Sequence, residues 1–232
     1  MSTQIKKAPK TKASDIFFLA LVTFLLILVE PILLNLLNMY GFGMAIALRA
    51  ICIVAWSFGV MGIIRSAKKE CNFDVLEKDT APSVVQWICV SIVTAAAVAY
   101  LIWNKFYIIE GNITSLTSVK NAVGFSSMIL VNAFKAIVLT LFVALIQKGS
   151  SLAFKAGKWI PLGGIVLGLI WVVMLLLSSV ELMGTESGFN WTVTLYQFAY
   201  GLIYGVIFVA IGNKAKYAFP FVLLVTLLIF IS

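Results

Sequence analysis

Few residues of this chain could do chemistry, and those few are widely spaced. The 232-residue sequence has no histidine, and its three cysteines, Cys52, Cys71 and Cys89, lack the close spacing of metal ligands. General acid–base and nucleophilic catalysis need a histidine, paired carboxylates or an activated thiol near the reacting atoms. We therefore expect no enzymatic activity, no catalytic residue, no metal and no cofactor.

Isolated polar residues inside apolar segments form the second group of interest. Glu30, Arg49 and Lys135 lie well inside such segments, and Asn132 lies one helical turn before Lys135. A charge at the centre of a bilayer is costly unless it has a partner or faces water. Glu30 and Arg49 lie at comparable depths in consecutive segments, which favours a pair between them. Such a pair either fixes the register of two helices or forms a ligand or ion site.

Lys135 is open to two interpretations. It lines a polar cleft with Asn132 and Asn35, or its long side chain extends along the helix towards a more polar environment. A pairing of Glu30 with Lys135 instead of Arg49 would favour the cleft.

Long apolar runs determine the expected elements. Hydrophobic residues make up 62% of the chain and charged residues 11%, against about 25% charged in soluble domains. A run of about 20 apolar residues crosses a bilayer as a helix. Seven runs are present: 16–39, 43–64, 84–103, 122–146, 160–180, 193–211 and a short last one, 219–231. They predict an all-α, polytopic integral membrane bundle of about seven helices, forming a single domain over residues 15–232 after a basic tail, 1–14.

Basic residues gather in alternate connections. They lie in the N-terminal tail, in the loop 65–82, and in residues 148–158 and 214–216, whereas the other connections keep only Lys105 and Lys120. By the positive-inside rule the N-terminus is cytoplasmic. The formal charge of +8 then indicates attraction to anionic lipid on the inner face, and no nucleic acid is expected. The lysine-rich, short-looped chain favours a bacterial plasma membrane.

The loop 65–82 is the longest connection on the inner side. Its stretch 71–76 alternates apolar and polar residues between Lys69 and Lys78. This pattern fits either a short amphipathic segment on the membrane surface or a solvated loop.

Small residues recur at helical spacing in the fifth and sixth segments. Gly164 and Gly168 form one GxxxG pair, and Gly201 and Gly205 form another, with Gln197 on the same face. Such faces let helices approach closely in lipid, so we expect helix packing or a partner interface here. The neighbouring stripe of tyrosines at 196, 200 and 204 favours packing over a cofactor site.

Residues 196–208, followed by Gly212-Asn213-Lys214 and Pro220, resemble the closing segment of the CAAX-protease and bacteriocin-processing (Abi) membrane family. The resemblance covers residues 121–232. It implies a helical core that, in the family, activates water with glutamates and histidines. Here Val143 and Ala144 occupy the glutamate positions and Leu175 a histidine position, and the last two positions fall near Leu224 and Leu228. The resemblance therefore implies a catalytically inactive relative.

Two functional hypotheses follow. The first is a non-catalytic membrane scaffold or binding protein that acts as a partner subunit or a bacteriocin-immunity-type factor and contacts a membrane protein or peptide. The alternative is a transporter, or a substrate-binding component of one, with a polar midplane site at Glu30, Arg49 and Lys135.

Overall fold

The computed structural model describes residues 11–37, 42–76, 81–108, 122–154, 158–181 and 191–230. Seven α-helices account for most of these residues. They are α1 (Ala13–Leu37), α2 (Phe42–Glu70), α3 (Val84–Ile108), α5 (Ala122–Ala153), α6 (Leu162–Glu181), α7 (Trp191–Ala210) and α8 (Ala215–Phe230).

The expectation of an all-helical chain built from apolar segments is confirmed. Among the described residues, four helices, α1, α2, α3 and α5, are long and apolar enough to cross a membrane. The helices α6, α7 and α8 are apolar but shorter over their hydrophobic stretches. This length pattern is that of a multi-pass membrane protein.

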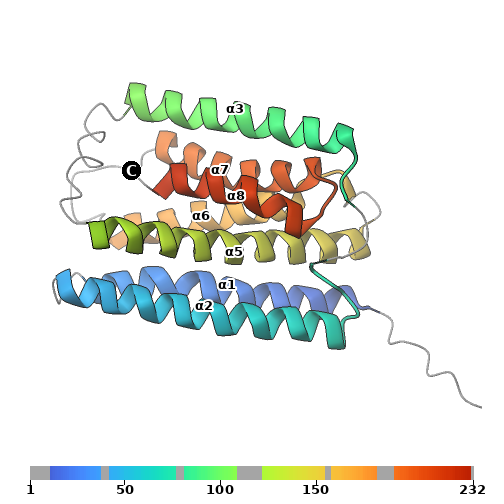
Figure 1. Cartoon of the computed structure of the whole chain (residues 1–232), viewed down its shortest axis with the longest axis horizontal. Coiled ribbons are helices and arrows are strands. Elements are labelled where there is room, and N and C mark those ends of the chain that lie inside the picture. Colours follow the sequence, from blue (N-terminus) through green and yellow to red (C-terminus); the bar gives the residue numbers. More distant parts are fainter. Residues whose placement is uncertain are drawn as a thin grey trace, which may run out of the picture.

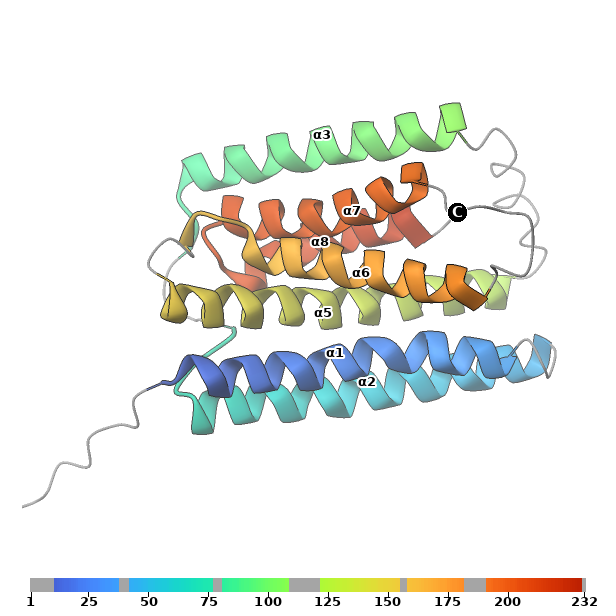
Figure 2. The ribbon, with the colours of Figure 1, turned by 180° about the vertical axis from the view of Figure 1, so that it is seen from behind.

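Consecutive helices run in opposite directions, so the connections gather at two ends of the bundle (Figures 1 and 2). One end holds the start of α1, the residues after α2, and the α5–α6 and α7–α8 connections. We call it the basic end, because it carries Lys12, Lys68, Lys69, Lys148, Lys158, Lys214 and Lys216. The C-terminus lies at the opposite end (Figure 1).

The helix α5 forms the centre of the bundle. It packs against the α1–α2 pair on one side and against α6, α7 and α8 on the other. Its residues Val138, Leu139, Phe142 and Leu145 are almost completely buried. The helix α3 lies at the edge and packs against α7 and α8, so much of its apolar surface stays exposed.

Several helices extend beyond their apolar runs. The helix α2 continues to Glu70, past the expected end at 64, and α5 continues to Ala153, past 146. The helix α8 begins at Ala215 rather than 219, because the Lys214 carbonyl accepts hydrogen bonds from the backbone N–H groups of Tyr217 and Ala218. Hydropathy locates the part of a helix that needs lipid, whereas hydrogen bonding decides where the helix ends.

The chain after α2 folds back onto the bundle. Cys71 and Val75 are buried, and Asn72 has a positive φ of 48° that helps turn the chain. The backbone N–H of Phe73 donates to the Ala67 carbonyl over 2.9 Å. Cys71 and Val75 thus pack against the bundle, whereas Asn72 and Leu76 stay exposed, and contact of residues 71–76 with the membrane surface stays a prediction. Residues 1–10, 77–80 and 109–121, with Lys78 and Lys120, lie outside the described residues.

Candidate functional site

An ion pair joins α1 to α5 in the interior of the bundle. Lys135 Nζ lies 2.7 Å from a carboxylate oxygen of Glu30, and the two side chains are only 15% and 14% exposed. This pair links α1 to α5, which is the pairing that favours a polar cleft. The pairing of Glu30 with Arg49 stays a prediction, and both α2 and α5 are neighbours of α1.

Further polar side chains surround this pair. Asn132 is buried one turn before Lys135 on α5. On α2 the thiol of Cys52 is buried within electrostatic reach of both Glu30 and Lys135. Arg49 is half-buried one turn before Cys52. The side chain of Asn35 lies outside the part of the chain that the structure describes.

Trp56 joins α2 to α1 next to this cluster, one turn of α1 before Glu30. Its indole Nε1 donates a 2.7 Å hydrogen bond to the Leu26 carbonyl, and its ring is buried. Arg49, Cys52 and Trp56 lie at helical spacing on one face of α2, so this face is turned towards α1. Neither Trp56 nor Cys52 was predicted as a neighbour of Glu30 and Lys135, although their spacing from Arg49 was a usable signal.

The four glycines of the small-residue faces contact one another. A Cβ atom added to Gly164 would lie 2.6 Å from backbone atoms of Gly205, and one added to Gly201 would overlap the backbone of Gly168. Backbone therefore meets backbone where α6 crosses α7. Gln197, on the same stripe of α7, is half-buried. Both glycine faces are covered within the chain itself.

The tyrosine stripe of α7 serves packing. Thr226 donates to the Val222 carbonyl, so Tyr204 donates its hydroxyl proton to Thr226 Oγ1 over 2.9 Å. The Tyr204 ring also meets Trp171 edge-on at 5.7 Å between ring centroids. Tyr196 meets Tyr100 of α3 at 6.4 Å. These contacts join α7 to α8, α6 and α3.

Gln147 links the end of α5 to the start of α6. Its amide Nε2 donates to the Ile160 carbonyl, and its Oε1 accepts from the N–H of Gly163. A side chain from one helix thereby caps the first turn of the next. The sequence signal for this role, not used in the predictions, is a glutamine directly after the apolar run 122–146.

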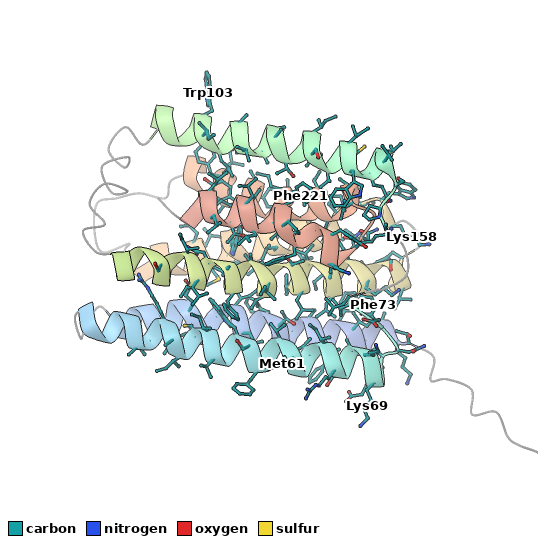
Figure 3. The ribbon with its side chains drawn as sticks, viewed as in Figure 1. Met61, Lys69, Phe73, Trp103, Lys158 and Phe221 are labelled. Carbon is teal, nitrogen blue, oxygen red and sulfur yellow. The ribbon has the colours of Figure 1, made fainter. Side chains whose placement is uncertain are left out.

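Polar contacts connect several segments at the basic end, the end at which Figure 3 labels Lys69, Phe73 and Lys158. Lys68 pairs with Asp74 at 2.8 Å, and the Lys148 ammonium lies 5.1 Å from the centroid of the Phe73 ring. The hydroxyl of Thr11 donates to the Cys71 carbonyl at 2.6 Å. Lys214 donates to the Ala81 carbonyl, which ties the α7–α8 turn to the start of α3.

Two grooves open between helices. The α1–α6 groove has a volume of about 470 Å³ and is lined by apolar residues: Phe24, Leu28, Val166, Leu169, Ile170, Val173 and Met174. The α1–α2 groove, of about 450 Å³, lies at the basic end and has Asp15 and Glu70 in its lining. Within the described residues, no group of three or more cysteine, aspartate or glutamate side chains could hold a metal ion.

Comparison of the chain with protein-family models, with characterised proteins and with solved structures finds no match. The resemblance of residues 121–232 to the CAAX-protease and bacteriocin-processing family therefore stays a prediction from the sequence.

Proposed function

We propose that the chain is a non-catalytic, multi-pass membrane protein that holds an apolar helix or hydrophobic peptide within the bilayer. It acts as a partner subunit or a bacteriocin-immunity-type factor. The observation that supports this proposal is the α1–α6 groove, which is open, almost entirely apolar and about 470 Å³ in volume.

The walls of this groove have the spacing that helix packing requires. Phe24 and Leu28 lie one turn apart on α1, while Val166, Leu169 and Val173 follow one stripe of α6. Ridges of side chains on one helix pack into such grooves on another. Leu169 and Val173 remain 52% and 51% exposed within the chain, so a partner would complete their packing.

The α6–α7 glycine faces cannot provide this surface, because they are already filled by each other. We therefore assign the partner interface to the other side of α6, at the α1–α6 groove, where side chains rather than backbone would contact the partner. In lipid, apolar side chains gain no hydrophobic driving force, so close packing must supply the affinity.

The location proposed for the protein is a bacterial plasma membrane, with the N-terminus and the basic end in the cytoplasm. Support comes from the lysines gathered at one end of the bundle, next to the start of α1. The class of partner, a peptide or a bacteriocin, rests on the resemblance of residues 121–232 to the Abi family, whose catalytic glutamate and histidine positions are apolar here.

A photo-crosslinking amino acid at Val173 tests the proposal in the native membrane. We expect one stoichiometric membrane protein or peptide to be captured from this position, and the same species from Leu169. A crosslinker at Ile92, exposed on the far side of α3, is the matched control and should capture lipid only.

A second variant, Val173→Trp, fills the groove with a bulky ring. Loss of the captured species from Leu169 in this variant, with no loss in Ile92→Trp, ties capture to the groove. Capture of lipid alone at Leu169 and Val173 in the unmodified groove would contradict the proposal.

Transport is a second candidate function, favoured by the cluster of Glu30, Lys135, Asn132 and Cys52 deep between three helices. Intramembrane charges of this kind often mark ion or substrate pathways. The double variant Glu30→Gln with Lys135→Gln removes both charges together. If the pair is structural, the double variant should still capture the partner. If the pair belongs to a transport site, the double variant should fold but should no longer support the cellular function of the protein.

A further inference from the structure

We propose that the α1–α2 groove is a binding site for one aminophospholipid, and specifically for a phosphatidylethanolamine headgroup with one acyl chain. The site is separate from the α1–α6 groove. It requires only that the helices span a membrane with the basic end at one surface.

The groove combines a polar mouth with an apolar interior. Its mouth lies where α1 begins and α2 ends, and its polar lining there is Asp15, Ser66 and Glu70. Deeper in, Phe18 of α1 and Phe58 of α2 form its apolar walls and are 63% and 71% exposed within the chain. A phospholipid has the same order of parts, with a polar headgroup at the surface and apolar chains below it.

Gly62 creates the space within this groove. A Cβ atom added there would meet nothing within 4 Å, whereas one added to the nearby Gly59 would overlap the Leu26 side chain. Glycine weakens the interior of a helix relative to alanine. At position 62 no close contact with a described neighbour requires a glycine. An open strip along α2 is what an acyl chain lying against the helix requires.

Two exposed carboxylates, those of Asp15 and Glu70, line the mouth. Within the described part of the chain, neither of them forms an ion pair. Both act on the same thiol, since burial raises the pKa of Cys71 and the charges of Asp15 and Glu70 raise it further. Two carboxylates in the lining of one mouth favour a compact ammonium group that donates several hydrogen bonds.

The remaining headgroup charge also finds a partner. Arg65 and Lys69 are exposed and lie one turn apart on the stripe of α2 next to Ser66 and Glu70. They suit a phosphate beside the ammonium. Phosphatidylethanolamine carries both groups, phosphatidylcholine has no N–H donor, and phosphatidylglycerol lacks the cation.

Native mass spectrometry of the full-length protein tests the site. The protein, delipidated in mild detergent, is titrated with phosphatidylethanolamine, phosphatidylcholine or phosphatidylglycerol of identical acyl chains. We expect one phosphatidylethanolamine to be retained about tenfold more strongly than either of the others, as charge-assisted hydrogen bonds allow.

Two kinds of variant locate the binding. Gly62→Leu puts a side chain into the groove at a position where an added Cβ atom meets nothing within 4 Å, and Asp15→Asn with Glu70→Gln removes the mouth charges while leaving the walls intact. Each should lower phosphatidylethanolamine retention to the level of phosphatidylcholine. Val173→Trp, in the other groove, and Asp74→Asn, which removes one acid from the same end, are the matched controls and should leave it unchanged.

Three outcomes would overturn the proposal. Equal retention of all three lipids would mean unselective annular lipid. Preference for phosphatidylglycerol would mean that the basic residues, and not the carboxylates, determine which lipid binds. If the protein forms dimers without bound lipid, and the Gly62→Leu variant does not, this face is instead an interface between two copies of the chain. Because the Asp15 and Glu70 substitutions leave the helix packing intact, the test remains valid if Gly62→Leu fails to fold.

Discussion

The ion pair between Glu30 and Lys135 ties α1 to α5 through side chains that are largely shielded from solvent. A buried pair adds little stability compared with apolar residues of the same shape, but removing one partner leaves an uncompensated charge. At the residue scale, the penalty for an unpaired charge is therefore the quantity to measure.

The single variants Glu30→Gln and Lys135→Gln should each lower the free energy of unfolding by about 3–5 kcal/mol, the cost of an unpaired buried charge. The double variant should lose much less, because no charge remains. Unfolding in a fixed mild detergent, followed by far-UV circular dichroism, gives the three values for a double-mutant cycle.

A coupling near zero in that cycle would contradict the pairing. The corresponding cycle of Glu30 with Lys68, which pairs with Asp74 at the basic end, is the control and should show a coupling near zero. The exchange Glu30→Lys with Lys135→Glu should recover part of the lost stability, since it restores opposite charges.

Tyr204→Phe removes the hydroxyl that donates to Thr226 and leaves the ring contact with Trp171 in place. We expect a loss of about 1 kcal/mol, the net value of one buried hydrogen bond. Tyr200→Phe is the control, because the Tyr200 hydroxyl forms no hydrogen bond within the described residues, and thermal unfolding should distinguish the two variants.

At the scale of elements, two glycines of the apolar helices have opposite surroundings. Gly201 lies against the backbone of Gly168, so a side chain there has no flexible neighbour to displace. Gly62 faces open space on α2. The same residue type therefore permits a close helix crossing at one position and opens a groove at the other.

Alanine substitutions at these two glycines should change the free energy of unfolding differently. Gly201→Ala should force α6 and α7 apart and cost about 1–3 kcal/mol, in the range of overpacked cores. Gly62→Ala should be neutral or stabilise α2 by up to about 1 kcal/mol through helix propensity. The thermal midpoints of both variants in one detergent provide the measurement, and equal shifts would contradict the assignment of the glycine contacts.

At the scale of the whole molecule, alternating helix directions place the connections at two ends, with the lysines at one of them. This arrangement makes the orientation in the membrane measurable with single cysteines. A cysteine at Lys158, before α6, and one at Ser187, which follows α6 in the sequence, should lie on opposite sides of the membrane, because α6 separates them.

In intact cells, an impermeant maleimide should label Ser187→Cys and should label Lys158→Cys only after the membrane is opened. The background carries Cys71→Ser and Cys89→Ser, and Cys52 is buried. The physical reason is the positive-inside rule applied to the basic end. Labelling in the reverse order would place the N-terminus outside the cell and contradict the orientation.

The sequence by itself determined the helices. Long apolar runs leave the backbone no alternative in lipid, so the seven segments from 16–39 to 219–231 correspond to the observed helices. Their apolar cores were located well, whereas ends such as Glu70 and Ala153 were not. Helix ends depend on local hydrogen bonds, as at Lys214, and hydropathy does not record these.

The tertiary structure alone decided which helices are neighbours. Glu30 has candidate cationic partners on α2 and α5, and distance along the chain cannot rank them, because both helices pack against α1. The contact of Gly164 with Gly205 and the folding of residues 71–76 onto the bundle are likewise contacts between distant residues. Hydropathy is a local property of each segment, whereas the choice of partner depends on side-chain shape and charge across the whole bundle.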